Sequence, residues 1–155
     1  MDKTYADTVR LLLAVAPDVF ANDIFAMKGG TAINLFVRDM PRLSVDIDVV
    51  YLPWQTPRDE ALQAINQELA AIATRVAPLG VQTRLVRAKD LGDTKLIVEN
   101  DASQVKIEVN VVFRGSVLPV ERRPLSAKTS DLFGVEFELP VLAPDELYAS
   151  KLVAA

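Results

Sequence analysis

The stretch from residue 28 to residue 48 constrains the fold of this chain more than any other. A glycine turn, Gly29-Gly30, directly follows a short apolar run, and the two acids Asp46 and Asp48 stand at the start of another. The apolar segment between the two motifs suits about two turns of helix. The predicted order is therefore strand, glycine turn, short helix and acidic strand.

The two acids point to one side of the predicted strand. Alternate side chains of a strand share a face, so Asp46 and Asp48 lie together while Ile47 lies opposite. Neighbouring carboxylates cost free energy unless a cation or a hydrogen-bond donor offsets them. Because Mg²⁺ prefers oxygen ligands, the pair is a candidate metal clamp. The alternative is a solvated strand end without a ligand.

The glycine turn is a candidate phosphate site. Backbone N–H groups at the start of a helix attract anions, and glycine lets a phosphate approach closely because it has no Cβ. The amides of Gly29, Gly30 and Thr31, with the Thr31 hydroxyl, would then hold phosphate oxygens. Lys28 would add its positive charge. The alternative is an ordinary turn, which is a common use of Gly-Gly.

Three strand-like segments occupy the middle of the chain, at residues 81–87, 95–99 and 104–113. Short turns between them predict an antiparallel meander. The third segment alternates most clearly and carries Glu108 on its polar side. If this strand pairs beside the acidic strand, Glu108 joins the two aspartates on one face. Otherwise Glu108 belongs to an edge strand with a solvated face.

Two long helices are predicted from the spacing of apolar residues. The first covers residues 4–20, and Pro17 predicts a break or distortion near its end. The second has Thr56 as its N-cap and Pro57 as its first helical residue, and it runs to about Val76. Its apolar positions alternate steps of three and four, which indicates packing on the sheet. The alternative is a surface for a partner helix.

The last part of the chain is less regular. Residues 114–134 predict an irregular excursion with at most a short strand, and residues 137–141 predict a final strand. A last helix begins at Pro144, with acids in its first turn. It stops at Ala155 among apolar residues and without a capping glycine. We therefore expect a truncated C-terminal helical region, and a homo-oligomer formed through the last helix.

Composition excludes several kinds of chemistry. The 155 residues, half of them apolar, suit a single domain over residues 1–155. Histidine and cysteine are absent, which excludes Ser-His-Asp and Cys-His catalysis, a usual zinc site and disulfides. The sequence shows neither a membrane span nor a secretory signal, so a cytoplasmic location is expected. The net charge of −4 argues against nucleic-acid binding over the whole surface, although residues 81–128 are net basic.

The segment 28–48 resembles the nucleotidyltransferase domain of the AbiEii/AbiGii toxin family, within the polymerase-β-like superfamily. That family shows a Gly-Gly-Ser/Thr turn, a short helix and an Arg-x-Ser-x-Asp-x-Asp strand. The matching residues are Gly29, Gly30, Thr31, Arg42, Ser44, Asp46 and Asp48. The resemblance implies an α+β fold with a polymerase-β-like nucleotidyltransferase core, a mixed sheet with helices mainly on one face. It also implies Mg²⁺-dependent transfer of a nucleoside monophosphate from a nucleoside triphosphate to an acceptor.

The resemblance also implies roles for individual residues. Asp46, Asp48 and Glu108 would hold one or two Mg²⁺ ions, because polymerase-β-like enzymes use a third carboxylate on a neighbouring strand. Lys151 matches a lysine that the family carries in the corresponding helix, upstream of a helical C-terminal region, and would reach the triphosphate. Ser44 would bind the same phosphate group or orient Asp46. These acids and Lys151 are the expected catalytic residues.

The family resemblance further implies an RNA acceptor, tRNA in some members, together with a toxin role and a cognate antitoxin of a type IV, AbiE-like system. One alternative is a catalytically incomplete fragment that binds only a nucleotide or a protein partner. Another is a structural or interaction domain in which both motifs are incidental. Transfer that appears only when the downstream segment is added would indicate an incomplete enzyme. A lack of bound Mn²⁺ near Asp46 and Asp48 would favour the structural or interaction domain.

Overall fold

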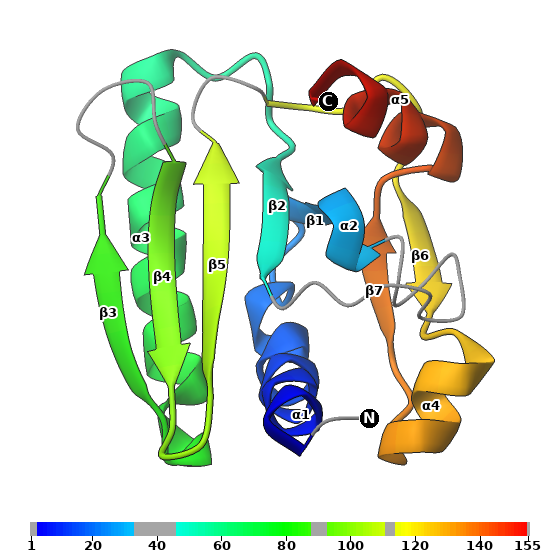
Figure 1. Ribbon diagram of the computed structural model, residues 1–155. Helices are drawn as coiled ribbons and strands as arrows, with labels where there is room; N and C mark the ends of the chain where they lie inside the picture. The colour runs from blue at the N-terminus through cyan, green and yellow to red at the C-terminus, as the bar shows by residue number, and fades with distance from the viewer. Residues whose placement is uncertain (1–2, 33–45, 88–92, 111–113, 155) are drawn as a thin grey trace.

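A mixed sheet of seven strands forms the body of the protein (Figure 1). The computed structural model describes residues 3–32, 46–87, 93–110 and 114–154. The strands are β1 (Phe25–Lys28), β2 (Ile47–Tyr51), β3 (Gln82–Val86), β4 (Asp93–Glu99), β5 (Gln104–Asn110), β6 (Glu121–Pro124) and β7 (Glu138–Val141). Their order across the sheet is β3-β4-β5-β2-β1-β7-β6. The predicted α+β class with a mixed sheet is confirmed.

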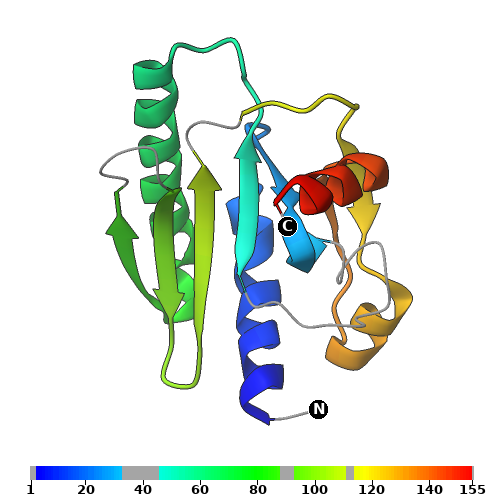
Figure 2. The ribbon, with the colours of Figure 1, turned by 45° about the horizontal axis from the view of Figure 1, so that its top comes forward.

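The helices are α1 (Lys3–Val19), α2 (Gly29–Ala32), α3 (Arg58–Val76), α4 (Ala127–Phe133) and α5 (Pro144–Ala154), and a 3₁₀ turn follows α3 at Ala77–Leu79. The long helices α1 and α3 contact each other. α1 packs on β5, and α3 packs on β4. Figures 1 and 2 show α5 at the other end of the sheet from α3, where it packs against α2. None of the described helices is long and apolar enough to cross a membrane.

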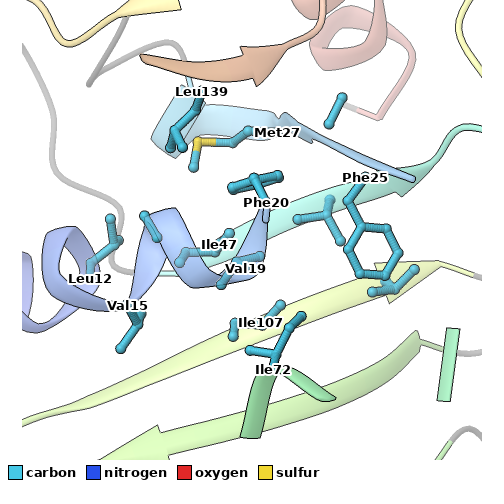
Figure 3. Close-up of a cluster of buried hydrophobic side chains, with 14 of the residues drawn as sticks. Leu12, Val15, Val19, Phe20, Phe25, Met27, Ile47, Ile72, Ile107 and Leu139 are labelled. Carbon is cyan, nitrogen blue, oxygen red and sulfur yellow. The ribbon is translucent and has the colours of Figure 1, made fainter. Parts of the chain in front are cut away.

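The core lies between the sheet and the two long helices. Ile47 of β2 and Ile107 of β5 are register partners, and both are fully buried. Figure 3 shows Ile47 beside Val19 of α1, and Ile107 beside Ile72 of α3. Because side chains alternate along a strand, the next residue of each strand points to the opposite face of the sheet. The core therefore decides which side chains are left for the candidate site.

The predicted meander is present, since β3, β4 and β5 pair antiparallel in sequence order. β5 then pairs in parallel with β2, while β1 pairs antiparallel with β2 on its other side. The connection from β2 to β5 runs through α3 and the first two strands of the meander. A parallel pair needs such a long crossover, and here its helix covers the core face.

Two predicted helix ends differ from the structure. Pro57, not Thr56, is the N-cap of α3, with φ −54° and ψ 148°, and no side chain caps this end. The proline ring sets a helix-like φ, but the extended ψ leaves Pro57 outside the helix. The second difference concerns the end of α1. This helix continues through Pro17 and ends at Val19, two residues after the proline. Of the helix predicted after the glycine turn, residues 33–39 lie outside the described ones.

The short helix α4 was not predicted, because residues 114–134 were expected to be irregular. Ser126 caps its start, where the side-chain oxygen accepts a hydrogen bond from the Thr129 amide at 3.3 Å. Gly134 ends it in the left-handed conformation, and its amide donates to the Ser130 carbonyl at 2.8 Å. A serine three residues before the capped amide and a glycine at the end were the available signals.

An ion pair within α3 is hydrogen-bonded to residues at the end of α1 and just after it. The Glu68 side chain is 8% exposed and lies 2.7 Å from Nη2 of Arg75. Nδ2 of Asn22 donates to both carboxylate oxygens of Glu68, at 2.9 and 3.1 Å. Nε of Arg75 donates to the Asp18 carbonyl at 3.0 Å. The two helices are thus joined by hydrogen bonds as well as by apolar packing.

Replacing Arg75 by leucine is expected to lower the free energy of unfolding by about 3 kcal/mol, because Glu68 is then buried without its charge partner. The double variant Glu68→Leu/Arg75→Leu should recover most of this loss, since it removes both charges. Urea denaturation of the two variants and the wild type measures the difference. A double variant as unstable as the single one would show that the ion pair is not the cause.

Candidate active site

A row of four charged residues crosses the sheet from β4 to β1. Lys95 of β4 pairs with Glu108 of β5, Glu108 with Asp48 of β2, and Asp48 with Lys28 of β1. Register partners in neighbouring strands project to the same face. This charged row (Lys28, Asp48, Glu108, Lys95) therefore lies on the face opposite the Ile47 side chain. Its charges run plus, minus, minus, plus.

The centre of the charged row is a pair of acids. Asp48 and Glu108 are direct partners in the parallel ladder, whose strands are about 4.8 Å apart. Both residues are half-buried, and the Glu108 side chain is 22% exposed. The predicted pairing of the Glu108 strand beside the acidic strand is confirmed. Two carboxylates this close need a cation, and Nζ of Lys95 lies 3.5 Å from Oε1 of Glu108.

The third acid of the prediction is placed differently. Asp46 is half-buried and precedes the first residue of β2, so the ladder does not fix its direction as it fixes Asp48. Among the described residues, no group of three or more acids, histidines or cysteines gathers closely enough to hold a metal ion. The expected convergence of Asp46 with Asp48 and Glu108 is therefore not found. The structure brings together the two acids that the ladder aligns.

The glycine turn touches the acid pair directly. Gly29 has φ +81°, and a Cβ built on it would lie 2.5 Å from Oδ2 of Asp48. Only glycine combines this backbone conformation with so close a carboxylate. Asp48 and the backbone at Gly29 are thus parts of one site, which the sequence motifs could suggest but could not locate in space. We call Gly29, Gly30 and Thr31 the glycine corner.

Thr31 has a different contact from the expected one. Thr31 is fully buried, and its hydroxyl donates a hydrogen bond to the backbone carbonyl of Asp46 at 2.5 Å. This bond joins α2 to the residue that precedes β2. The hydroxyl that was predicted to hold phosphate therefore fixes the geometry of the glycine corner, and the backbone amides are the groups left for an anion.

Two further predicted residues are located only in part. Lys151 belongs to α5, and that helix packs against α2, which contains the glycine corner (Figure 2). The helix that carries Lys151 therefore contacts the helix that contains the corner, and the role of this lysine stays a prediction. Ser44 and Arg42 lie outside the described residues, so their predicted roles stay predictions.

Sequence analysis missed Lys95. The residue was assigned to the second strand of the meander, but it was not considered for the site. The available sequence signal was the predicted turn between the second and third strands of the meander. In the structure this turn is a hairpin in which the Asn100 amide donates to the Ser103 carbonyl at 2.9 Å. This turn pairs Glu99 with Gln104, and the same register carries Lys95 opposite Glu108.

The donor chemistry of the site fits Mg²⁺. Asp48 and Glu108 offer hard oxygen ligands side by side, which is the ligand type that Mg²⁺ prefers. The lack of a Cβ at Gly29 keeps the Asp48 carboxylate next to bare backbone, where a phosphate could also be bound. The lysines at the two ends of the charged row add positive charge that suits a triphosphate.

Comparison with known proteins identifies the family. A family model described as "Nucleotidyl transferase AbiEii toxin, Type IV TA system" matches residues 10–155. No curated protein and no solved structure gives a significant match. The matched region includes the charged row and the glycine corner. Together with the Gly-Gly-Thr turn and the acid pair, the match shows that the chain belongs to the AbiEii family of nucleotidyl transferase toxins of type IV toxin–antitoxin systems.

Proposed function

We propose that this chain transfers a nucleoside monophosphate from a nucleoside triphosphate to an acceptor, in a Mg²⁺-dependent reaction at the charged row. The observation that supports this most is the register pairing of Asp48 with Glu108, next to a glycine with no room for a side chain. Phosphoryl and nucleotidyl transfer need positioning and charge compensation more than covalent chemistry from the protein. This site offers both.

Asp48 and Glu108 would hold the metal, with Asp46 as the candidate further ligand once nucleotide is bound. A bound Mg²⁺ supplies compensation of the triphosphate charge and activation of the acceptor oxygen. The carboxylates also orient whatever cation they hold relative to the glycine corner, because Asp48 lies against Gly29. Since the chain has no histidine, proton transfer at the acceptor would fall to a carboxylate, a lysine, a tyrosine or a metal-bound group.

The glycine corner and the lysines would bind the triphosphate. The backbone amides of Gly29, Gly30 and Thr31 are the proposed donors to phosphate oxygens. Lys28 is the last residue of β1 and adjoins this corner, and Lys151 is proposed to reach the triphosphate from α5, which packs on α2. Ser44 remains the proposed additional phosphate contact. These groups act by holding charge and position.

The acceptor and the partner are proposed from the family. An RNA acceptor, tRNA among the candidates, agrees with the net basic charge of residues 81–128. The type IV toxin–antitoxin assignment implies a cognate antitoxin. The proposed location of the chain and of these partners is the cytoplasm. Each of these statements is open to direct test with purified components.

Replacing either acid of the central pair is expected to remove transfer. Asp48→Asn and Glu108→Gln keep the shape of the side chain but remove the charge that a metal needs, so activity should fall at least about 100-fold. Transfer of α-³²P-labelled nucleotide to total RNA in Mg²⁺ measures it, with each nucleoside triphosphate tested separately. Asp101→Asn, in the exposed turn before β5, is the matched control and should keep full activity.

Melting temperatures of the same variants show whether they are folded. Transfer at the wild-type rate by folded Asp48→Asn and Glu108→Gln would place the chemistry elsewhere. Loss of activity in Asp101→Asn as well would point to a general effect of removing acids and not to this pair.

A substitution at Gly29 tests the contact between the corner and the acid. Gly29→Ala should destabilise the fold by more than the ~1–2 kcal/mol cost of a positive φ, because its Cβ also displaces the Asp48 carboxylate. Gly80→Ala is the control, since Gly80 has φ +78° but no atom within 4 Å of a built Cβ. Urea denaturation and binding of nucleotide in Mg²⁺ give the two readouts. Equal destabilisation and equal binding in both variants would contradict the proposed contact.

A further inference from the structure

Glu108 stands between an acid and a cation. On one side its ladder partner is Asp48, and on the other side its ladder partner is Lys95. Nζ of Lys95 lies 3.5 Å from Oε1 of Glu108, and the two side chains are 37% and 22% exposed. The lysine therefore neutralises one of the two carboxylates to which the proposed function assigns the metal.

A lysine ammonium and a divalent cation compete for such an oxygen. Both are attracted by the same negative charge, and each repels the other at this range. When the ammonium is in contact with Oε1, a metal that needs this oxygen must first displace it. The presence of Lys95 thus makes metal binding to the acid pair weaker than the carboxylates alone would allow.

We propose that Lys95 is the resting counter-ion of Glu108, and that it competes with a divalent cation for this carboxylate until a triphosphate binds. The inference rests on the proposed function only for its premise that Asp48 and Glu108 hold a metal. Lysine suits the role because its charge sits on a flexible four-carbon stem, and more than a third of this side chain is exposed. It can leave Glu108 without any movement of β4.

The displaced ammonium stays on the face of the charged row. There it can pair with the negative charge that the triphosphate brings to the glycine corner. Metal alone then binds weakly because Lys95 opposes it, whereas metal with nucleotide binds well because Lys95 has a new partner. Lys95 would thereby couple metal binding to nucleotide binding, and such coupling is reciprocal.

Titration of the full chain with Mn²⁺ alone tests the competition, with free Mn²⁺ measured by electron paramagnetic resonance at 0.15 M salt. Lys95→Met should bind Mn²⁺ about fivefold more tightly than the wild type, in line with the strength of a partly exposed ion pair. Lys95→Arg keeps the charge and should bind as weakly as the wild type. Lys106→Met removes a lysine from the face of β5 that also carries Glu108. It should change the Mn²⁺ affinity little, because Lys106 is not the ladder partner of Glu108.

A second titration adds a non-hydrolysable nucleoside triphosphate. Nucleotide should raise the Mn²⁺ affinity of the wild type by a larger factor than that of Lys95→Met, because only the wild type has a lysine to release. Circular dichroism and the melting temperature establish that each variant is folded before it is compared.

The outcomes separate the inference from its premise. If the wild type and Lys95→Met bind Mn²⁺ equally well, and Asp48→Asn does not, the metal site stands and the competition is wrong. If none of these proteins binds Mn²⁺ with or without nucleotide, the metal premise of the proposed function fails and the inference fails with it. A gain in Lys106→Met as large as that in Lys95→Met would also overturn the specific role of Lys95.

Discussion

The parallel pairing of β2 with β5 is the contact on which the rest of the structure depends. It places Ile47 beside Ile107 on one face, where α1 and α3 cover them, and Asp48 beside Glu108 on the other. One register therefore builds the core and the candidate site together, because side chains alternate along each strand. A slip of one residue would turn the acids into the core and the isoleucines out of it, at a cost that no ion pair could offset.

The long crossover between these strands explains why the acid face is available. α3 belongs to this connection and packs on the core face of the sheet, as α1 does. The two long helices therefore do not cover the face that carries the charged row. The short α2 and the packing of α5 on it then bring the glycine corner and the last helix to the same region. A Cβ at position 29 would collide with the Asp48 carboxylate, so the corner and the acid pair act as one unit.

Much of the fold could be predicted because the signals are local. Alternation predicted the meander, helical spacing predicted α1 and α3, and the Gly-Gly and acidic motifs predicted the elements around the site. The failures were of two kinds. Short elements with few residues, such as α4, depend on caps such as Ser126 and Gly134 that were not weighed together. A single position such as Thr31 depends on a contact, here the hydrogen bond to the Asp46 carbonyl, that the alternation of a strand does not describe.

The sequence by itself determined which residues are polar and which are apolar on each strand, the glycine at the corner, and the absence of histidine and cysteine. Those features leave carboxylates, lysines, arginines, hydroxyl groups and backbone amides for the chemistry. Only the tertiary structure decided that Glu108 is the neighbour of Asp48, that Lys95 lies against Glu108, and that Asp46 stands outside the ladder. The physical reason is that strand pairing joins segments far apart in the chain, and its register is set by burial of the whole core and not by any local pattern.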